Sequence, residues 1–250
     1  MFGPQFAFFA GRRRLIAIDL PGHGRSADAI DPRRTYSLSG YADCAAECLT
    51  KIGVDRAAVL GWSLGGHVAL EMIPKYSGLL RLMIVGSPPF VRKDDGFAGF
   101  KPNPKFGLAG AAVLSQSQID EFVTLASDCD SPPEPFWREA VARTHPIARQ
   151  YLFEDVLLQE SARQRDLAEG CPVPLAIVNG AADQLVDLEY VASLNYRNLW
   201  SGQMHVFEGL GHAPHLHAPD RFNALLERFL AGENGPYSAE PPHTVSNLRL

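Results

Sequence analysis

The 250-residue sequence lacks the features that mark membrane-spanning, secreted or nucleic-acid-binding proteins. No apolar run approaches the roughly 18–20 residues that a membrane-spanning helix needs. A net charge of −5 provides no basic surface for nucleic acid or anionic lipid. The arginines at positions 12–14 follow an apolar stretch, which is the reverse of the order in a signal peptide. We therefore expect a cytoplasmic protein with neither a membrane nor a nucleic-acid partner.

Cysteine is also scarce, and no metal or cofactor motif is present. The four cysteines form no CxxC pair, and a chain of this length needs no disulfide framework, so we expect them to be reduced. There is no HExxH motif, no GxGxxG after a strand and no phosphate-binding P-loop. Three closely spaced histidines could bind zinc in principle, but no second ligand cluster accompanies them. The sequence thus predicts no metal and no cofactor; the residues concerned are Cys44, Cys48, Cys129, Cys171, His212, His215 and His217.

The hydrophobic pattern predicts a mostly parallel sheet flanked by helices. Short runs rich in Val, Ile and Leu are bounded by Gly, Pro or Ser and are apolar on both faces, as in a sheet covered on both sides. Other segments repeat apolar residues at helical spacing. The predicted strands are residues 15–20, 57–62, 80–86, 174–180 and 205–208. The predicted helices are a short one ending near 10–14, then 38–52, 64–76 and 220–231, the last with Asp220 as its N-cap.

One long segment interrupts this alternation. Residues 92–168 contain two Pro-rich stretches and several helical ones, which is typical of a helical cap inserted into an α/β core. The core is then residues 1–91 together with 169–231. Residues 232–250 are polar and Pro-rich, and we expect them to form a flexible tail.

Residues 61–65 read Gly-Trp-Ser-Leu-Gly between a predicted strand and a predicted helix. This setting indicates a nucleophile elbow, in which a sharp turn exposes the Ser63 hydroxyl at the edge of the sheet. We expect Gly61 and Gly65 to let the strand and helix approach closely. The backbone N–H of Leu64 would point at a developing oxyanion.

A serine hydroxyl needs a neighbouring base, and His212 is the best candidate. It lies in GLGHAP, after the last predicted strand, and so fits a Ser, Asp, His order along the chain. The acid is expected on the loop after residues 174–180, where Asp183 is favoured; Asp187 is the alternative, although it suits a helix cap better. Two further histidines are interpreted as structural: His67, one helical turn past Ser63, and His205, inside a strand.

Together, IAIDLPGHGRS (16–26), GWSLGG and GLGHAP resemble the α/β-hydrolases over residues 12–231. GWSLGGHVALEMI (61–73), GSPP (86–89), IVNGAADQLVDLEYV (177–191) and NLWSGQMHVFEGLGHAP (198–214) are similar to the metal-independent N-acyl-homoserine lactonases of that fold. This resemblance implies an α/β-hydrolase fold and opening of a homoserine lactone ring through an acyl-enzyme on Ser63. It implies that the cap lines an acyl-chain pocket, with Trp62 and the aromatic residues Phe97, Phe100, Phe106, Phe122 and Phe136 as candidates.

The sequence departs from those lactonases at three places. They carry Glu at the acid position that Asp183 matches, and a cap tyrosine where this chain has Phe122. They also begin with further strands and an HG-type loop that supplies the second oxyanion donor. We therefore expect the first strands to be absent here, and loss of one oxyanion donor costs about 10²–10³ in turnover.

Two alternatives to a lactonase remain open. One is a general carboxylesterase or a C–C bond hydrolase of the same fold, which would differ in its cap. The other is a protein that binds a small ligand in a hydrolase-like pocket without turnover. In each case the expected partner is a small apolar ester or lactone.

Overall fold

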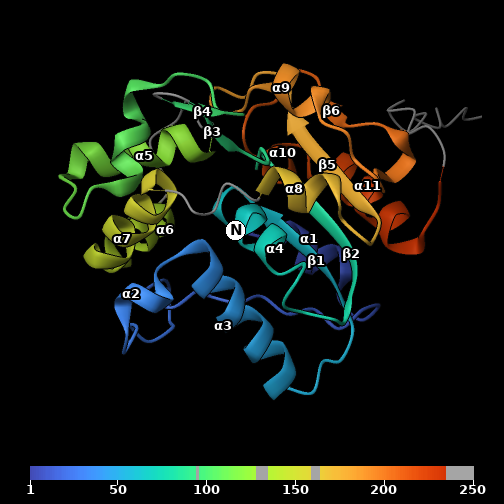
Figure 1. Ribbon diagram of the computed structural model, residues 1–250, viewed down its shortest axis with the longest axis horizontal. Helices are drawn as coiled ribbons and strands as arrows, with labels where there is room; N and C mark the ends of the chain where they lie inside the picture. Colours follow the sequence, from blue (N-terminus) through green and yellow to red (C-terminus); the bar gives the residue numbers. More distant parts are fainter. Residues whose placement is uncertain (94–95, 128–134, 159–163, 235–250) are drawn as a thin grey trace, which may run out of the picture.

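The computed structural model describes residues 1–93, 96–127, 135–158 and 164–234 (Figure 1). Its main sheet has four described strands: β1 (Ala57–Trp62), β2 (Leu79–Val85), β5 (Leu175–Gly180) and β6 (His205–Phe207). They are all parallel and lie in the order β1-β2-β5-β6. The predicted strands 57–62, 80–86, 174–180 and 205–208 are confirmed to within one residue at each end. All four carboxyl ends therefore meet at one edge of the sheet.

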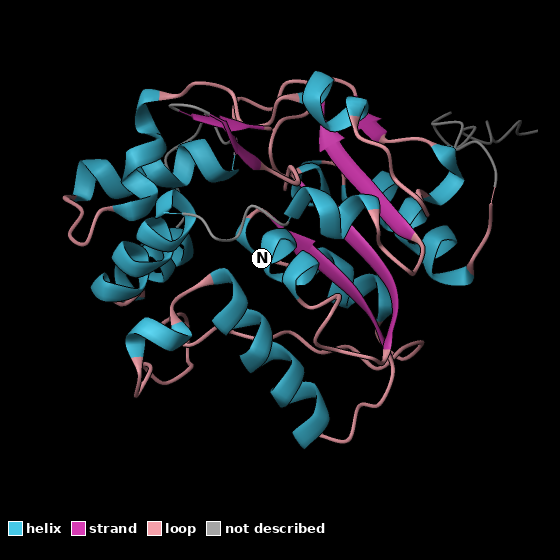
Figure 2. Ribbon diagram, viewed as in Figure 1, coloured by secondary structure: helices cyan, strands magenta, loops and turns pink. Residues whose placement is uncertain are grey.

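The sheet is covered on both faces, as expected of an α/β-hydrolase fold (Figure 2). Successive residues of β2 point to opposite faces. Leu82 and Ile84 belong to the core cluster that includes residues of α3 (Leu38–Lys51) and α4 (Leu64–Glu71). Met83 and Val85 belong to the other cluster, with α1 (Gly3–Phe9) and α11 (Pro219–Ala231). All four of these β2 side chains are fully buried, which explains why the strand is apolar throughout.

Helix boundaries follow local chemistry. Ser37 caps α3, because its side chain accepts a hydrogen bond from the Gly40 N–H. The prediction that Asp220 caps the last helix is wrong: α11 begins at Pro219, and Ala218 is the N-cap. Proline suits the first helical position, so the helix starts one residue earlier than expected. The remaining short helices of the core are α2 (Pro32–Thr35), α9 (Leu188–Ser193), η2 (Trp200–Gly202) and α10 (Pro214–His217).

Three other sequence predictions need correction. Residues 15–20 form no strand, although Ile16 and Ile18 pack against the core. Apolar composition explains that packing, but a strand also needs a neighbouring backbone to pair with. The predicted helix 64–76 ends at Glu71, because Pro74 disfavours helical geometry in the residue before it. The first helix, expected to reach residues 10–14, ends at Phe9.

The segment between β2 and β5 is mainly helical where it is described. A short antiparallel hairpin that the sequence did not predict, β3 (Val91–Lys93) with β4 (Gly96–Ala98), leads into it. The helices that follow are η1 (Pro104–Gly110), α5 (Gln116–Ser127), α6 (Pro135–Arg143), α7 (Pro146–Leu158) and α8 (Gln164–Glu169). We propose that residues 92–168 form the cap of this protein, with α8 returning the chain to the core beside α4.

Across these described ranges, no helix is long and apolar enough to cross a membrane. Cys44 and Cys48 are half-buried on α3 and Cys171 is buried, and all three are free thiols. Cys129 and most of the predicted tail, residues 235–250, lie outside the described residues.

Candidate active site

Ser63 occupies a strained turn between β1 and α4. Its backbone dihedrals are φ 51° and ψ −120°, a conformation that residues with a side chain rarely adopt. Two contacts hold it there: its N–H donates to the Val85 carbonyl over 2.9 Å, and its carbonyl accepts from the Ser87 hydroxyl over 2.8 Å. The turn places the Ser63 hydroxyl at the carboxyl edge of the sheet.

Two glycines, Gly61 and Gly66, allow β1 and α4 to approach each other at this turn. The sequence predicted Gly61 but named Gly65 as the second glycine. A Cβ on Gly61 would lie 2.3 Å from the Gly65 carbonyl oxygen, and a Cβ on Gly66 would lie 2.0 Å from the Ser87 hydroxyl. A Cβ on Gly65 would meet nothing within 4 Å, so the prediction that Gly65 provides the close approach is wrong. That function belongs to Gly66, because it is the glycine that faces the residues after β2.

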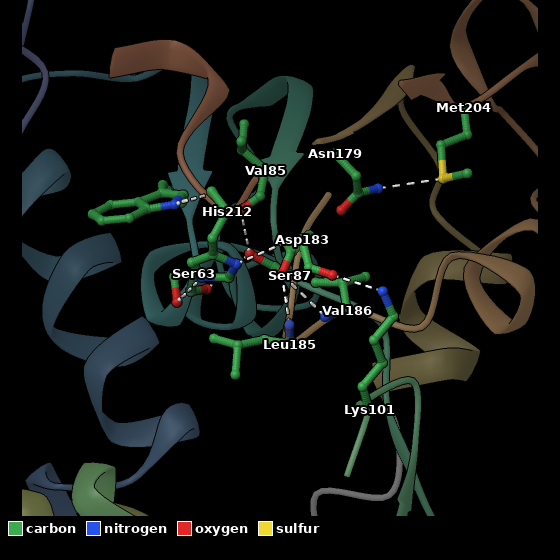
Figure 3. Close-up of polar contacts among 11 residues, drawn as sticks. Ser63, Val85, Ser87, Lys101, Asn179, Asp183, Leu185, Val186, Met204 and His212 are labelled. Atoms are coloured by element: carbon green, nitrogen blue, oxygen red, sulfur yellow. Dashed lines mark hydrogen bonds and ion pairs between the residues drawn. The ribbon is translucent and has the colours of Figure 1, made fainter. Parts of the chain in front are cut away.

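Three side chains far apart in the sequence form one hydrogen-bonded chain at this edge (Figure 3). His212 Nε2 lies 2.9 Å from Ser63 Oγ, and His212 Nδ1 lies 2.8 Å from Asp183 Oδ2. Asp183 follows β5 and His212 follows β6, so the sheet brings both to the end of β1. Asp183 and His212 are 1% and 3% exposed, which keeps water from competing for these hydrogen bonds.

The Asp183 carboxylate is held on both of its oxygens. Besides the contact with His212, its Oδ1 accepts from the N–H groups of Leu185 over 2.8 Å and Val186 over 3.2 Å. Burial raises the pKa of Asp183, but hydrogen bonds from His212 and the backbone, with the charge of His212, outweigh burial and leave that pKa below its ordinary value. An ionised carboxylate only accepts, so Nδ1 of His212 donates and Nε2 is left to accept the Ser63 proton.

The alternative acid, Asp187, lies elsewhere and has another function. Its side chain accepts from the N–H groups of Glu189 and Tyr190, both over 3.1 Å, and so caps α9. The structure thus brings Asp183, and not Asp187, to His212.

Trp62, predicted to contact substrate, packs against the histidine. It is 7% exposed, and its indole N–H donates to the His212 carbonyl over 2.8 Å. Its ring centroid lies 5.9 Å from that of His212 and 4.9 Å from that of His215. Since the indole is buried, we expect Trp62 to hold the His212 backbone in place.

The other histidines near the site have separate environments. His67 Nδ1 lies 2.7 Å from the Gln164 side-chain oxygen, and burial lowers the pKa of His67 to about 4. His215 is fully buried against aromatic rings, and burial lowers its pKa to about 3. His217 Nε2 lies 2.5 Å from the Ser127 carbonyl oxygen. In the described part of the chain, no group of three or more His, Cys, Asp or Glu residues is arranged to hold a metal ion.

Comparison with known proteins assigns the fold to a family. The sequence profile of the alpha/beta hydrolase family matches residues 1–225. The chain belongs to the α/β-hydrolase family. A variant of the N-acyl homoserine lactonase AidH, solved with N-hexanoyl homoserine, is 40% identical to this α/β-hydrolase, with a TM-score of 0.86. That alignment covers 95% of this chain and 86% of the AidH chain.

Other relatives of this α/β-hydrolase are esterases. The pimeloyl-(acyl-carrier protein) methyl ester esterase of Stenotrophomonas maltophilia is 29% identical over 241 residues, which are 93% of this chain and 88% of that protein. The esterase RhEst1 from Rhodococcus sp. ECU1013 is 22% identical over 94% of this chain and 86% of its own, with a TM-score of 0.72. The last comparison shows a shared fold only.

The predicted oxyanion donor of this α/β-hydrolase is Leu64. It is the first residue of α4, so its N–H has no carbonyl one turn earlier in the helix to bond to. The helix N-terminus also favours negative charge beside Ser63. The position of Leu64 directly after the nucleophile is therefore compatible with an oxyanion donor.

Phe97, Phe100 and Phe106, three of the aromatic residues predicted to line a pocket, pack against one another and against the core. The Phe97 ring lies 5.6 Å from Phe90, Phe100 lies 5.2 Å from Phe106, and Phe106 lies 5.9 Å from Phe153. Such spacings are those of a packed aromatic cluster. These phenylalanines join the segment after β2 to α7 and to the core.

The other two aromatics have different surroundings. Phe122 is half-buried, and the Arg149 guanidinium lies 5.5 Å from the centre of its ring. Phe136 is 54% exposed, so its ring contributes little to any buried pocket. Its neighbour Trp137 reaches further inward, with its ring 6.1 Å from that of Trp62. Sequence reasoning did not select Trp137, although it lies in the same FWRE stretch.

Ser87 was also missed as a site residue. It lies in the GSPP stretch directly after β2, and its buried hydroxyl is within hydrogen-bond distance of the carbonyls of Ser63 and Val85. The stretch was noted only as part of a family resemblance. A polar residue at the carboxyl end of a strand next to the nucleophile strand was the available signal.

Proposed function

We propose that this protein hydrolyses carboxylic esters and lactones through an acyl-enzyme on Ser63. The supporting observation is the hydrogen-bonded chain from Ser63 through His212 to Asp183 in a buried site. In such a chain the histidine is the base, and the carboxylate fixes its tautomer and stabilises the imidazolium. Family membership and the esterase and lactonase relatives favour the same chemistry.

The proposed reaction has two halves. In the first, Ser63 Oγ attacks the carbonyl carbon while His212 Nε2 takes its proton, and the resulting oxyanion is stabilised by the Leu64 N–H. His212 then returns the proton to the leaving alkoxide as the C–O bond breaks. In the second half, His212 takes a proton from water, the hydroxide attacks the acyl-enzyme, and Ser63 is released with its proton.

For the substrate we propose N-acyl homoserine lactones. The chain is 40% identical to AidH, whose structures contain N-hexanoyl homoserine and N-butanoyl homoserine, over 95% of its length. The leaving alkoxide of a lactone stays attached to the acyl group, so hydrolysis consumes one water and yields a single ring-opened product.

One observation favours a second candidate, a carboxylesterase without lactone specificity. Phe122 stands where the resemblance implies a tyrosine hydroxyl, and a phenyl ring donates no hydrogen bond to a lactone. The relationship to a methyl ester esterase is compatible with this alternative. A protein that only binds such ligands is the alternative from another class.

The test is product analysis with N-butanoyl and N-hexanoyl homoserine lactone in ¹⁸O-labelled water. We expect the ring-opened acid with one ¹⁸O atom in its carboxylate, detected by mass spectrometry. Turnover of aryl acetates but of neither lactone, even at high enzyme concentration, would remove the lactonase proposal and leave the carboxylesterase.

Ser63→Ala is the control for both candidates. We expect it to lower turnover by about 10⁴–10⁶-fold, because the nucleophile is lost, while the folded protein still binds the lactone. Unchanged hydrolysis in Ser63→Ala would refute the assignment of the nucleophile. Ligand binding without turnover in the unmodified protein would identify it as a binding protein.

A further inference from the structure

A lysine from the segment after β4 touches the backbone of the catalytic acid. Lys101 Nζ donates to the Asp183 carbonyl oxygen over 2.6 Å, and Figure 3 shows its side chain reaching the Asp183 loop. The residue is exposed as a whole, but its ammonium group is the end that makes this contact. A hydrogen bond from a charged donor is among the stronger ones in proteins.

The backbone around Lys101 is tied to the same loop. The Lys101 N–H donates to the Leu185 carbonyl over 2.8 Å, and the Asp187 N–H donates to the Gly99 carbonyl over 2.9 Å. Phe100 and Val186 form an antiparallel bridge between these two bonds. Residues 99–101 therefore pair with residues 185–187, which fixes the direction from which the Lys101 side chain approaches Asp183.

The two ends of Asp183 are thus held from different parts of the chain. Its carboxylate is bound by N–H groups of its own loop and by His212, whereas its carbonyl is bound by Lys101. Rotation of the peptide after Asp183 would move the Leu185 and Val186 N–H groups relative to the carboxylate. The loop can then keep its hydrogen bonds only by shifting Oδ2 away from His212.

We infer that Lys101 is a positioning residue for the catalytic acid, which couples the segment after β4 to the orientation of His212. The inference rests on the proposed function, because it concerns the acid of that site. Lys101 touches neither Ser63 nor His212 in the described contacts, so it acts through Asp183. Since small displacements of catalytic groups cost rate, its loss should lower kcat more than it raises KM.

The experiment compares Lys101→Met with Lys101→Arg. Methionine keeps an unbranched stem but removes the donor, whereas arginine keeps a charged donor. Lys105→Met is the matched control, because Lys105 lies on η1, is half exposed and has its nearest carboxylate, Glu121, 3.9 Å away. We expect Lys101→Met to lower kcat about tenfold with KM nearly constant, Lys101→Arg to restore most of it, and Lys105→Met to match the unmodified protein.

A substrate-independent measurement separates this inference from the proposed substrate. A fluorophosphonate phosphonylates an activated serine with loss of fluoride, so its rate constant reports Ser63 activation even if neither lactone is hydrolysed. The proton on His212 Nδ1, assigned by its absence in His212→Gln, reports the contact with Asp183 by NMR. We expect Lys101→Met to slow phosphonylation about tenfold and to shift this proton signal.

Folded Lys101→Met with an unchanged phosphonylation rate and an unchanged His212 proton signal would overturn the inference. An equal loss in Lys105→Met, or no recovery in Lys101→Arg, would also overturn it. If Lys101→Met does not fold, Lys101→Leu, which also removes the donor, takes its place with the same criteria. Failure of the unmodified protein to react with the fluorophosphonate would refute the serine mechanism, whereas the NMR comparison would still decide the position of the acid.

Discussion

Ser63, the proposed nucleophile, and Asp183, the proposed acid, are positioned in different ways. Ser63 is held by the close packing at Gly61 and Gly66 and by two contacts from the adjacent strand region, the Val85 carbonyl at the end of β2 and the Ser87 hydroxyl just after it. Asp183 lies on a loop whose geometry depends on residues 99–101, more than eighty positions away. The nucleophile turn is therefore supported by the strand next to it in the sheet, whereas the acid loop is also supported by a segment outside the sheet.

The largest effect is expected when each of the two candidate acids is replaced in turn by asparagine. Asp183→Asn should lower kcat about 10⁴-fold, since an amide favours the wrong imidazole tautomer. Asp187→Asn should leave kcat nearly unchanged and alter stability by less than about 1 kcal/mol, because asparagine is also a good helix N-cap. Steady-state kinetics measures kcat of both variants, and urea unfolding measures their stability. Equal kinetic losses would show that the acid loop works as a unit instead of through Asp183 alone.

The loss of folding stability at acid pH should show which buried histidine contributes to it. Burial lowers the pKa of His67, behind the nucleophile turn, to about 4 and that of His215, behind His212, to about 3. As the pH falls below about 6.5, these histidines become protonated in the unfolded chain but stay neutral in the folded chain. Their contribution to the free energy of unfolding is therefore complete above pH 6.5 and is lost as the pH falls toward the folded-state pKa values of about 4 and 3. Each histidine contributes a loss of up to about 2 kcal/mol between pH 6.5 and pH 5.

Urea unfolding at pH 7 and pH 5 measures this loss, and His215→Phe is the informative variant. Neither ring nitrogen of His215 has a hydrogen-bond partner in the described structure, so phenylalanine should keep the packing and reduce the pH dependence. A pH dependence of stability as large in His215→Phe as in the unmodified protein would mean that the loss comes from other buried histidines, such as His67 and His205, whose pKa burial also lowers to about 4.

The last test compares the two glycines of the nucleophile turn, where Gly65→Ala should have the smallest effect. Gly66→Ala should destabilise the fold by about 1–3 kcal/mol, because its Cβ would meet the Ser87 hydroxyl at 2.0 Å. Gly65→Ala, with open space around its Cβ, should change stability by less than about 1 kcal/mol. Thermal unfolding compares the two variants, and adding Ser87→Gly to Gly66→Ala should recover part of the loss. Equal destabilisation by Gly65→Ala would contradict the packing described here.

The sequence predicted those features of the molecule that depend on local pattern. The strands β1, β2 and β5 were confirmed because their sequences are predominantly apolar, although only β5 is buried at every position. Residues 15–20 have the same composition but no partner strand, so composition alone predicted a strand where none forms. Likewise, a Gly-x-Ser-x-Gly pattern marked the turn, but it could not say which of two adjacent glycines faces Ser87.

What the sequence alone determined is the chain order of the three residues and the position of the turn at Ser63, because the Gly-x-Ser-x-Gly pattern between a strand and a helix marks such a turn. Only the tertiary structure decided between Asp183 and Asp187, placed Trp62 against His212 and brought Lys101 to the acid loop. Those contacts join residues from different strands and helices, and their distances depend on how the sheet and the segment between β2 and β5 pack together.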